Sequence, residues 1–114
     1  ALLRHILSNL LSNAVRYSPA GSLVTVVLLG DDRRFQVSVQ DRGIGIPVAD
    51  RSRIFEPFER ASNVGNIKGT GLGLSIVKRM TDLLGGTVAI DAPEEKGIRF
   101  TLTFPRHGAA HPPP

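Results

Sequence analysis

Two asparagines near the start of the chain could bind a metal ion. Asn9 and Asn13 are four residues apart in a stretch of good helix formers, a spacing that places their side chains on neighbouring turns of a helix. Asparagine is a mediocre helix former, so its presence twice needs a reason. Its amide oxygen is a neutral, hard ligand that suits Mg²⁺, which takes few protein oxygens and completes its shell with phosphate and water. Two exposed polar side chains without a ligand are the alternative.

A carboxylate followed by glycines could recognise a flat ring that carries an amine. Asp41 opens the stretch DRGIGIP (41–47), in which Gly43 and Gly45 follow at alternate positions. The carboxylate can accept a hydrogen bond from an exocyclic amine, and the glycines let a ring approach the backbone. A turn at the end of a strand is the alternative, because aspartate and glycine are common in turns.

Three alternate glycines at the start of a helix could hold a phosphate. In GTGLGLSIVK (69–78), Gly69, Gly71 and Gly73 lead into an apolar helical pattern, and the first N–H groups of a helix are unpaired and partly positive. A backbone without Cβ atoms lets phosphate come close, and Lys68 adds a point charge beside it. The stretch lacks the GK[ST] of a P-loop and the last glycine of the dinucleotide fingerprint. A loop that only needs room to turn is the alternative.

Helices and strands must position these residues. Apolar residues at helical spacing predict one helix over residues 1–17 and a second that begins near Leu72 and stops at Gly85-Gly86. Strands are predicted at 22–30, mostly β-branched and interpreted as buried, and at 35–41, 87–92 and 98–104.

Strands that follow one another across short turns pair antiparallel, and two helices with apolar stripes must cover one face of the resulting sheet. The pattern therefore predicts a two-layer α+β sandwich. The irregular stretch from Gly43 to Gly71, with a short helical piece near 49–55, has the length typical of a functional or mobile segment.

Composition narrows the classes of function. The chain has 114 residues, enough for one domain, and no cysteine, which excludes disulfides and thiolate metal sites. Its net charge of +4 is scattered and only 5% of its residues are aromatic, so we expect no nucleic-acid partner. No apolar run is long enough to span a membrane. The proline-rich residues 107–114 are expected to be a disordered tail.

Four stretches in a fixed order resemble a known family. NLLSNAVRYS (9–18), DRGIGIP (41–47), IFEPFER (54–60) and GTGLGLSIVK (69–78) resemble the N, G1, F and G2 boxes of the catalytic ATP-binding domain of bacterial sensor histidine kinases. Gyrase B, heat-shock chaperone and mismatch-repair ATPases belong to the wider superfamily. The resemblance covers residues 2 to about 104. It implies a Bergerat-type fold, with a mixed, mostly antiparallel sheet covered on one face by helices, over a domain of residues 1–106.

The resemblance also implies roles for the matching residues. Asn13 would be the direct Mg²⁺ ligand, with Asn9 beside it toward the phosphates, and Arg16 would complete the catalytic set. Residues from about 47 to 68 would form a mobile lid, hinged by the phenylalanines at positions 55 and 58. The residues expected to bind ATP are Asn13, Tyr17, Asp41, Gly43, Gly45, Ile46, Arg60, Lys68, Gly69, Thr70, Gly71, Leu72 and Gly73. Within this set, Tyr17 would lie along the nucleotide and Asp41 would accept the adenine amine.

The implied function is phosphoryl transfer from Mg²⁺-ATP to a histidine of a separate phospho-acceptor helical hairpin, which signals to a response regulator. Hydrolysing members of the superfamily carry glutamate where this chain has Asn9, and an amide cannot act as a general base. This difference favours transfer to a protein side chain over hydrolysis. A nucleotide-binding module without transfer activity and a hydrolysing ATPase remain as alternatives.

The resemblance further predicts an excised cytoplasmic domain, with trimming at the N-terminus left open. Family members usually have a short strand before the first helix, whereas this chain begins on the helix itself. Membrane attachment of the parent protein is an expectation from the family only.

Overall fold

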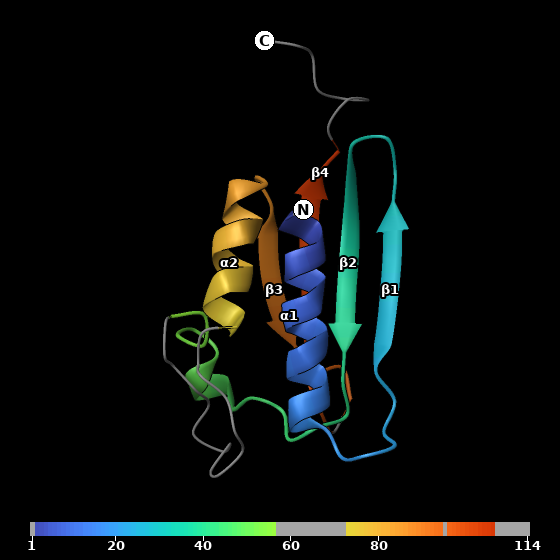
Figure 1. Cartoon of the computed structure of the whole chain (residues 1–114), viewed down its shortest axis with the longest axis vertical. Coiled ribbons are helices and arrows are strands. Elements are labelled where there is room, and N and C mark those ends of the chain that lie inside the picture. The colour runs from blue at the N-terminus through green and yellow to red at the C-terminus, as the bar shows by residue number, and fades with distance from the viewer. Residues whose placement is uncertain (1, 57–72, 95, 107–114) are drawn as a thin grey trace.

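The computed structural model describes residues 2–56, 73–94 and 96–106. Two α-helices, a short 3-10 helix and four strands follow one another along the chain (Figure 1). In chain order they are α1 (Leu2–Tyr17), β1 (Thr25–Gly30), β2 (Arg34–Gln40), η1 (Val48–Asp50), α2 (Gly73–Leu83), β3 (Thr87–Asp91) and β4 (Arg99–Pro105).

The four strands form one sheet in the order β1-β2-β4-β3, and every pairing among them is antiparallel. The pairs β1–β2 and β3–β4 are the two hairpins expected from the short turns. The third pairing, β2–β4, joins residues far apart in the sequence and places Phe35 opposite Phe104, with their rings stacked 5.2 Å apart. This central pairing makes one sheet out of two local hairpins.

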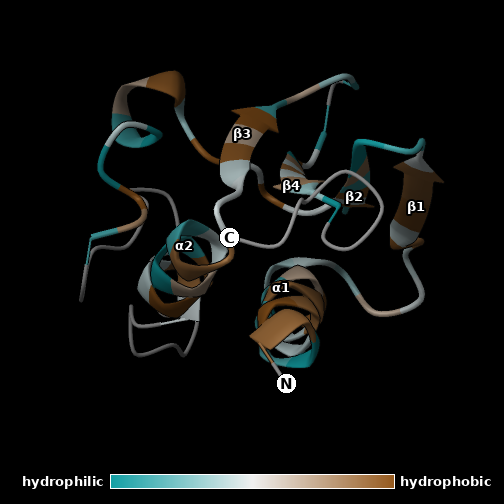
Figure 2. Ribbon diagram, turned by 90° about the horizontal axis from the view of Figure 1, so that it is seen from above, coloured by the Kyte–Doolittle hydropathy of each residue, from teal (hydrophilic) through white to brown (hydrophobic). Residues whose placement is uncertain are grey.

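Both α-helices cover the same face of the sheet, as Figure 2 shows from one end. The core lies between the two layers and is built from one stripe of each helix and the inward side chains of β2 and β4. It contains Ile6, Leu10, Ala14, Val39, Ile46, Ile54, Val77, Ile98, Phe100, Leu102 and Phe104. The predicted two-layer α+β sandwich, with helices on one face, is therefore confirmed.

Strand β1 is exposed along its whole length, so the prediction of a buried strand was wrong. It lies at the edge of the sheet, beyond the helices (Figure 2). Leu28 and Leu29 are 69% and 61% exposed. A β-branched run predicts a strand but does not tell an edge from a centre. Helix α1 also carries a second apolar row, formed by Leu3, Leu7, Leu11 and Val15, which lines an open groove.

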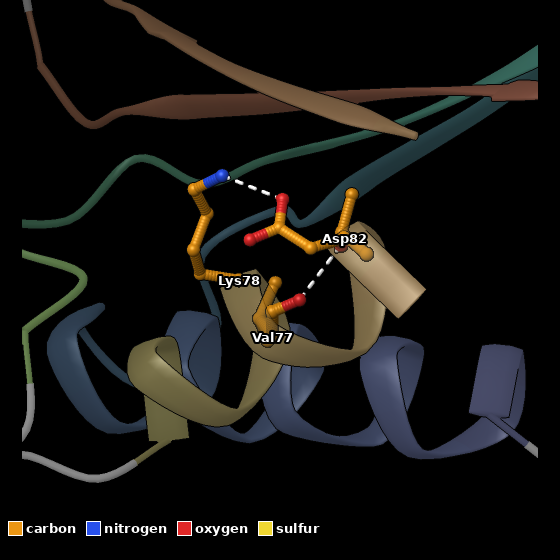
Figure 3. Close-up of polar contacts among 4 residues, drawn as sticks. Val77, Lys78 and Asp82 are labelled. Atoms are coloured by element: carbon orange, nitrogen blue, oxygen red, sulfur yellow. Dashed lines mark hydrogen bonds and ion pairs between the residues drawn. The ribbon is translucent and has the colours of Figure 1, made fainter. Parts of the chain in front are cut away.

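Helix α2 ends as its sequence predicts. Gly85 adopts a positive φ of 75°, and the Gly86 N–H donates to the Thr81 carbonyl over 2.9 Å, so the last carbonyls are paired. Figure 3 shows the Lys78–Asp82 ion pair (2.6 Å) on the exposed side of this helix. On the buried side, the Thr81 hydroxyl donates to the Val77 carbonyl over 2.7 Å. These contacts fix the body of α2, whose first residue, Gly73, belongs to the candidate site.

Candidate nucleotide-binding site

Four chain segments meet at one end of the molecule. Figure 1 shows the C-terminal end of α1, the C-terminal end of β2 and the N-terminal end of α2 at the same end, together with the β3–β4 turn. Three of these segments carry residues that the sequence predicts to bind a nucleotide. The fold therefore collects stretches that lie far apart along the chain.

Asp41 is an almost fully buried carboxylate directly after β2. Only 4% of its surface is exposed, and its backbone N–H donates to the Ile98 carbonyl over 3.0 Å. The Gly43 N–H donates to Asp41 Oδ1 over 2.9 Å. Burial raises the pKa of Asp41, while the N–H groups of Gly43 and Ile98 act in the opposite direction. A carboxylate offers about four acceptor sites on its two oxygens, so capacity remains for a ligand amine.

Gly43 packs against the end of α1 so closely that no side chain fits. A Cβ atom on Gly43 would lie 2.1 Å from the Tyr17 carbonyl oxygen. The next peptide binds that same oxygen, because the Ile44 N–H donates to it over 3.2 Å. The loop that carries Asp41 is thus fastened to the end of α1. Gly45 has a positive φ of 74°, which glycine adopts without strain, and Ile46 anchors the loop in the core.

Asn9 lies where α1 meets the first residue of α2. Its Nδ2 donates to the His5 carbonyl over 2.8 Å, which leaves Oδ1 on the opposite side of the amide. That oxygen would lie 3.4 Å from a Cβ atom on Gly73. Asn13 follows one turn later on α1 and is half-buried, Tyr17 is half-buried at the helix end, and Arg16 is exposed. Helix α1 therefore presents polar side chains along its length between the Asp41 loop and the start of α2.

Part of the predicted site lies outside the described residues. This holds for Arg60, Lys68, Gly69, Thr70, Gly71 and Leu72, for one of the two hinge phenylalanines, and for the predicted tail at 107–114. The other hinge residue, Phe55, packs edge-to-face on Phe100, with 6.1 Å between the ring centroids. The roles proposed for the undescribed residues stay predictions.

Two residues of this region were not predicted. Gly97, in the turn between β3 and β4, packs against the backbone of Asp41. Ser18 has an enclosed hydroxyl with no hydrogen-bond partner, the one such side-chain atom among the residues that the structure describes. Its oxygen would lie 3.1 Å from a Cβ atom on Gly43. A glycine just before β4 could have indicated a close backbone contact at Gly97. Nothing in the sequence around Ser18 distinguishes it from an ordinary helix end.

Ser18→Ala is expected to leave the free energy of unfolding unchanged or to raise it by about 1 kcal/mol, because it removes a buried hydroxyl that has no partner. The matched control is Ser22→Ala. The Ser22 hydroxyl donates to the Pro19 carbonyl over 2.7 Å, so its loss is expected to cost about 0.5–1 kcal/mol. Urea unfolding of both variants measures the difference. A loss of stability in Ser18→Ala as large as that in Ser22→Ala would contradict the geometry around Ser18.

Comparison with known proteins decides the family. A model of the family described as histidine kinase-, DNA gyrase B- and HSP90-like ATPases matches residues 1–108. The chain belongs to this family. A relative within the histidine kinase-, DNA gyrase B- and HSP90-like ATPases is the sensor histidine kinase YcbM of Bacillus subtilis, 40% identical over 106 residues, which cover 91% of this chain and 34% of that protein. Another is the sensor histidine kinase RcsC of Salmonella typhimurium, 36% identical over 96% of this chain and 12% of that protein.

Solved histidine kinases of the family share the fold. The mycobacterial sensor histidine kinase MprB superposes with a TM-score of 0.85 at 32% identity, over 91% of this chain and 72% of the MprB chain. Full-length ShkA in complex with AMPPNP superposes with a TM-score of 0.72 at 35% identity, over 96% of this chain and 22% of the ShkA chain. The chain thus corresponds to an ATPase-family domain and spans about a third or less of the curated relatives named above.

No helix in the described part of this family member is long and apolar enough to cross a membrane.

Proposed function

We propose that this domain binds Mg²⁺-ATP and transfers the γ-phosphoryl group to a histidine on a separate phospho-acceptor hairpin, which then serves a response regulator. The observation that carries the proposal is the double contact of α1. Tyr17 at its end meets Gly43 of the Asp41 loop, and Asn9, about 12 Å back along the helix axis, meets Gly73 at the start of α2. That separation suits a base at one end and phosphates at the other.

The base end would select adenine through Asp41. The buried carboxylate accepts from the Gly43 N–H and has acceptor capacity left for the 6-amino group. Gly43 and Gly45 of the same loop pack against the backbones of Tyr17 and Gly97, which fixes the loop that carries this carboxylate. These features support a purine with an exocyclic amine over one with a carbonyl at the same position.

The phosphate end would be built from the amide oxygens of α1 and the start of α2. Among the described residues, no group of three or more histidine and acidic side chains gathers to hold a metal. Asn13, with Asn9 beside it, would hold Mg²⁺ together with phosphate oxygens, because an amide oxygen is a hard, neutral ligand that suits this ion. The ion would neutralise charge on the phosphates. The positive end of the α2 dipole would face the same charge.

Phosphoryl transfer at this site would need positioning more than a base. The P–O bond to ADP breaks as a P–N bond forms to the unprotonated ring nitrogen of the acceptor histidine, and the other ring nitrogen then loses its proton to solvent. An amide at position 9 cannot activate water, which favours a protein nucleophile.

Titration of the chain with Mg²⁺-ATP, followed by addition of a phospho-acceptor hairpin, tests the proposal. Binding with histidine phosphorylation supports it. Binding without transfer would indicate a nucleotide-binding module, and steady phosphate release without the hairpin would indicate a hydrolysing ATPase. Absence of ATP binding would contradict the proposal as a whole.

Asn13→Asp is expected to weaken Mg²⁺-ATP binding about tenfold, because the new negative charge would face the phosphates. Calorimetric titration measures the loss. Ser12→Asp is the matched control, since Ser12 is exposed and adds the same charge at a neighbouring position of α1 to which no ligand contact is assigned. Equal affinities for the two variants would contradict the metal role of Asn13.

A further inference from the structure

The turn that joins β3 to β4 supports the loop that carries Asp41. The Ile98 carbonyl accepts the Asp41 N–H over 3.0 Å, so the last residue of the turn continues the pairing of β2 with β4. Arg42 Nε lies 3.4 Å from Glu94 Oε2, which adds a partly exposed ion pair between the same two segments. The Asp41 loop therefore rests on a turn that begins about fifty residues later in the sequence.

Gly97 is the closest point of this support. It is buried and has a positive φ of 89°. A Cβ atom at this position would lie 1.9 Å from the Asp41 carbonyl oxygen and 2.8 Å from Arg42 Cα. On its other side, the Gly97 carbonyl oxygen would lie 3.2 Å from a Cβ atom on Gly45. Gly97 therefore packs against two stretches of backbone, the peptide of Asp41 on one side and Gly45 on the other.

We infer that Gly97 is a positioning residue for base selection: its bare backbone sets the place of Asp41, and through Asp41 it sets the preference of the site for an amine-bearing purine. The inference rests on the proposed function. Gly97 does not touch the base. It acts through the Asp41 peptide, whose N–H and carbonyl oxygen both face the same turn.

A methyl group at position 97 would push the Asp41 peptide by roughly 1 Å, because real Cβ atoms do not approach an oxygen to 1.9 Å. The buried carboxylate moves with its backbone, and the Gly43 N–H that it accepts is fixed to α1 through the neighbouring Ile44–Tyr17 bond. The carboxylate therefore cannot follow without losing one of these contacts. A displacement of this size is large for a directional hydrogen bond to a ligand.

The test compares Gly97→Ala with Gly21→Ala in the 114-residue chain. Gly21 also has a positive φ, 81°, but a Cβ atom there would meet nothing within 4 Å, so this variant carries the backbone strain without the clash. The probes are ATP and inosine triphosphate, which has a carbonyl oxygen in place of the 6-amino group. Calorimetry gives both dissociation constants, and their ratio reports base selection.

We expect the unsubstituted chain and Gly21→Ala to prefer ATP by about tenfold or more. In Gly97→Ala the preference is expected to fall toward one, with ATP affinity reduced about tenfold. In an Asp41→Asn background, Gly97→Ala is expected to change ATP affinity less than twofold, because the two changes remove the same interaction. A folded Gly97→Ala variant with an unchanged ratio, or additive effects in the double variant, would overturn the inference.

A measurement on the unsubstituted chain applies if Gly97→Ala does not fold. Addition of ADP is expected to shift the amide NMR signals of Gly97 and Ile98 and to leave those of Gly21 and Gly85 in place. Unmoved signals at Gly97 and Ile98 in a chain that binds ADP would overturn the inference alone. A chain that binds neither ADP nor ATP would overturn the proposed function as well.

Discussion

Asp41→Asn is expected to lower the affinity of the chain for ATP by about 1–3 kcal/mol, roughly 5- to 150-fold, and to raise its affinity for inosine triphosphate. A carboxylate accepts on both oxygens, so it can serve the Gly43 N–H and a ligand amine together. An amide has one oxygen, so its NH₂ group must face one of these two donors. The same NH₂ group can donate to the carbonyl of inosine. Calorimetry with both nucleotides measures the inversion.

Asp31→Asn is the matched control for this prediction. Asp31 Oδ1 also accepts two backbone N–H groups, from Arg33 and Arg34, but it lies in the β1–β2 turn at the opposite end of the molecule (Figure 1). The affinities of the Asp31→Asn variant for both nucleotides are expected to match those of the unsubstituted chain. Equal ATP affinity for the Asp41 and Asp31 variants would remove Asp41 from the site.

Because burial raises the pKa of Asp41, the Asp41→Asn variant is also expected to change how the free energy of unfolding depends on pH. The unfolded carboxyl has a pKa near 3.8, and burial raises the folded value above it. Between the two values the folded chain holds a proton that the unfolded chain has lost, so the contribution of Asp41 to the free energy of unfolding falls as the pH rises. Asparagine does not titrate. The stability of Asp41→Asn relative to the unsubstituted chain is therefore expected to increase between about pH 3 and pH 7. Denaturant unfolding of both chains at these two pH values measures the sign of the change. A decrease in the relative stability of Asp41→Asn would contradict the burial of the charge.

Gly43→Ala is expected to cost about 3 kcal/mol of folding stability and to abolish ATP binding. The added methyl group would meet the Tyr17 carbonyl oxygen at 2.1 Å, and neither partner is a flexible side chain that could turn away. Relief requires the Asp41 loop to leave the end of α1. That movement breaks the Ile44–Tyr17 hydrogen bond and displaces the Asp41 carboxylate. Thermal unfolding and ATP titration measure the two losses.

Gly73→Ala is the control that distinguishes a steric clash from the replacement of a glycine as such. A Cβ atom on Gly73 would lie 3.4 Å from Asn9 Oδ1, an ordinary contact, and alanine favours a helix over glycine by about 1 kcal/mol. This variant is expected to be as stable as the unsubstituted chain or more so. If Gly43→Ala unfolded at the same temperature as Gly73→Ala, the close approach of the Asp41 loop to α1 would be wrong.

The features that the sequence predicts best depend on neighbours in the chain. The buried stripe of α1, the end of α2 at Gly85 and the two hairpins all follow from spacing within one or two turns. The contact between Gly97 and Asp41 depends instead on the pairing of β2 with β4. No local pattern encodes the register of two strands that lie some sixty residues apart. For the same reason, the packing of Gly43 on α1 becomes visible only in the folded chain.

Burial was predicted less well than strand position. Strand β1 (TVVLLG) is more apolar than β2 (RFQVSVQ), yet β2 is central and contributes to the core, whereas β1 is exposed on both faces. The difference arises because the two helices do not cover β1. The apolar stripe of a helix does not specify which strands that helix will cover. The unpartnered hydroxyl of Ser18 is equally invisible in the sequence, because it depends on how closely the Asp41 loop meets the helix.

The open edge at β1 has a consequence for how the protein behaves in concentrated solution. A strand with free backbone groups and bare aliphatic side chains is a template on which another chain can add by edge-to-edge pairing. Above a threshold concentration, clouding on warming would then begin from folded molecules that stick together, before any of them melts. Leu28 is 69% exposed in the middle of this strand, so a lysine in its place is expected to oppose such pairing and to reduce the clouding.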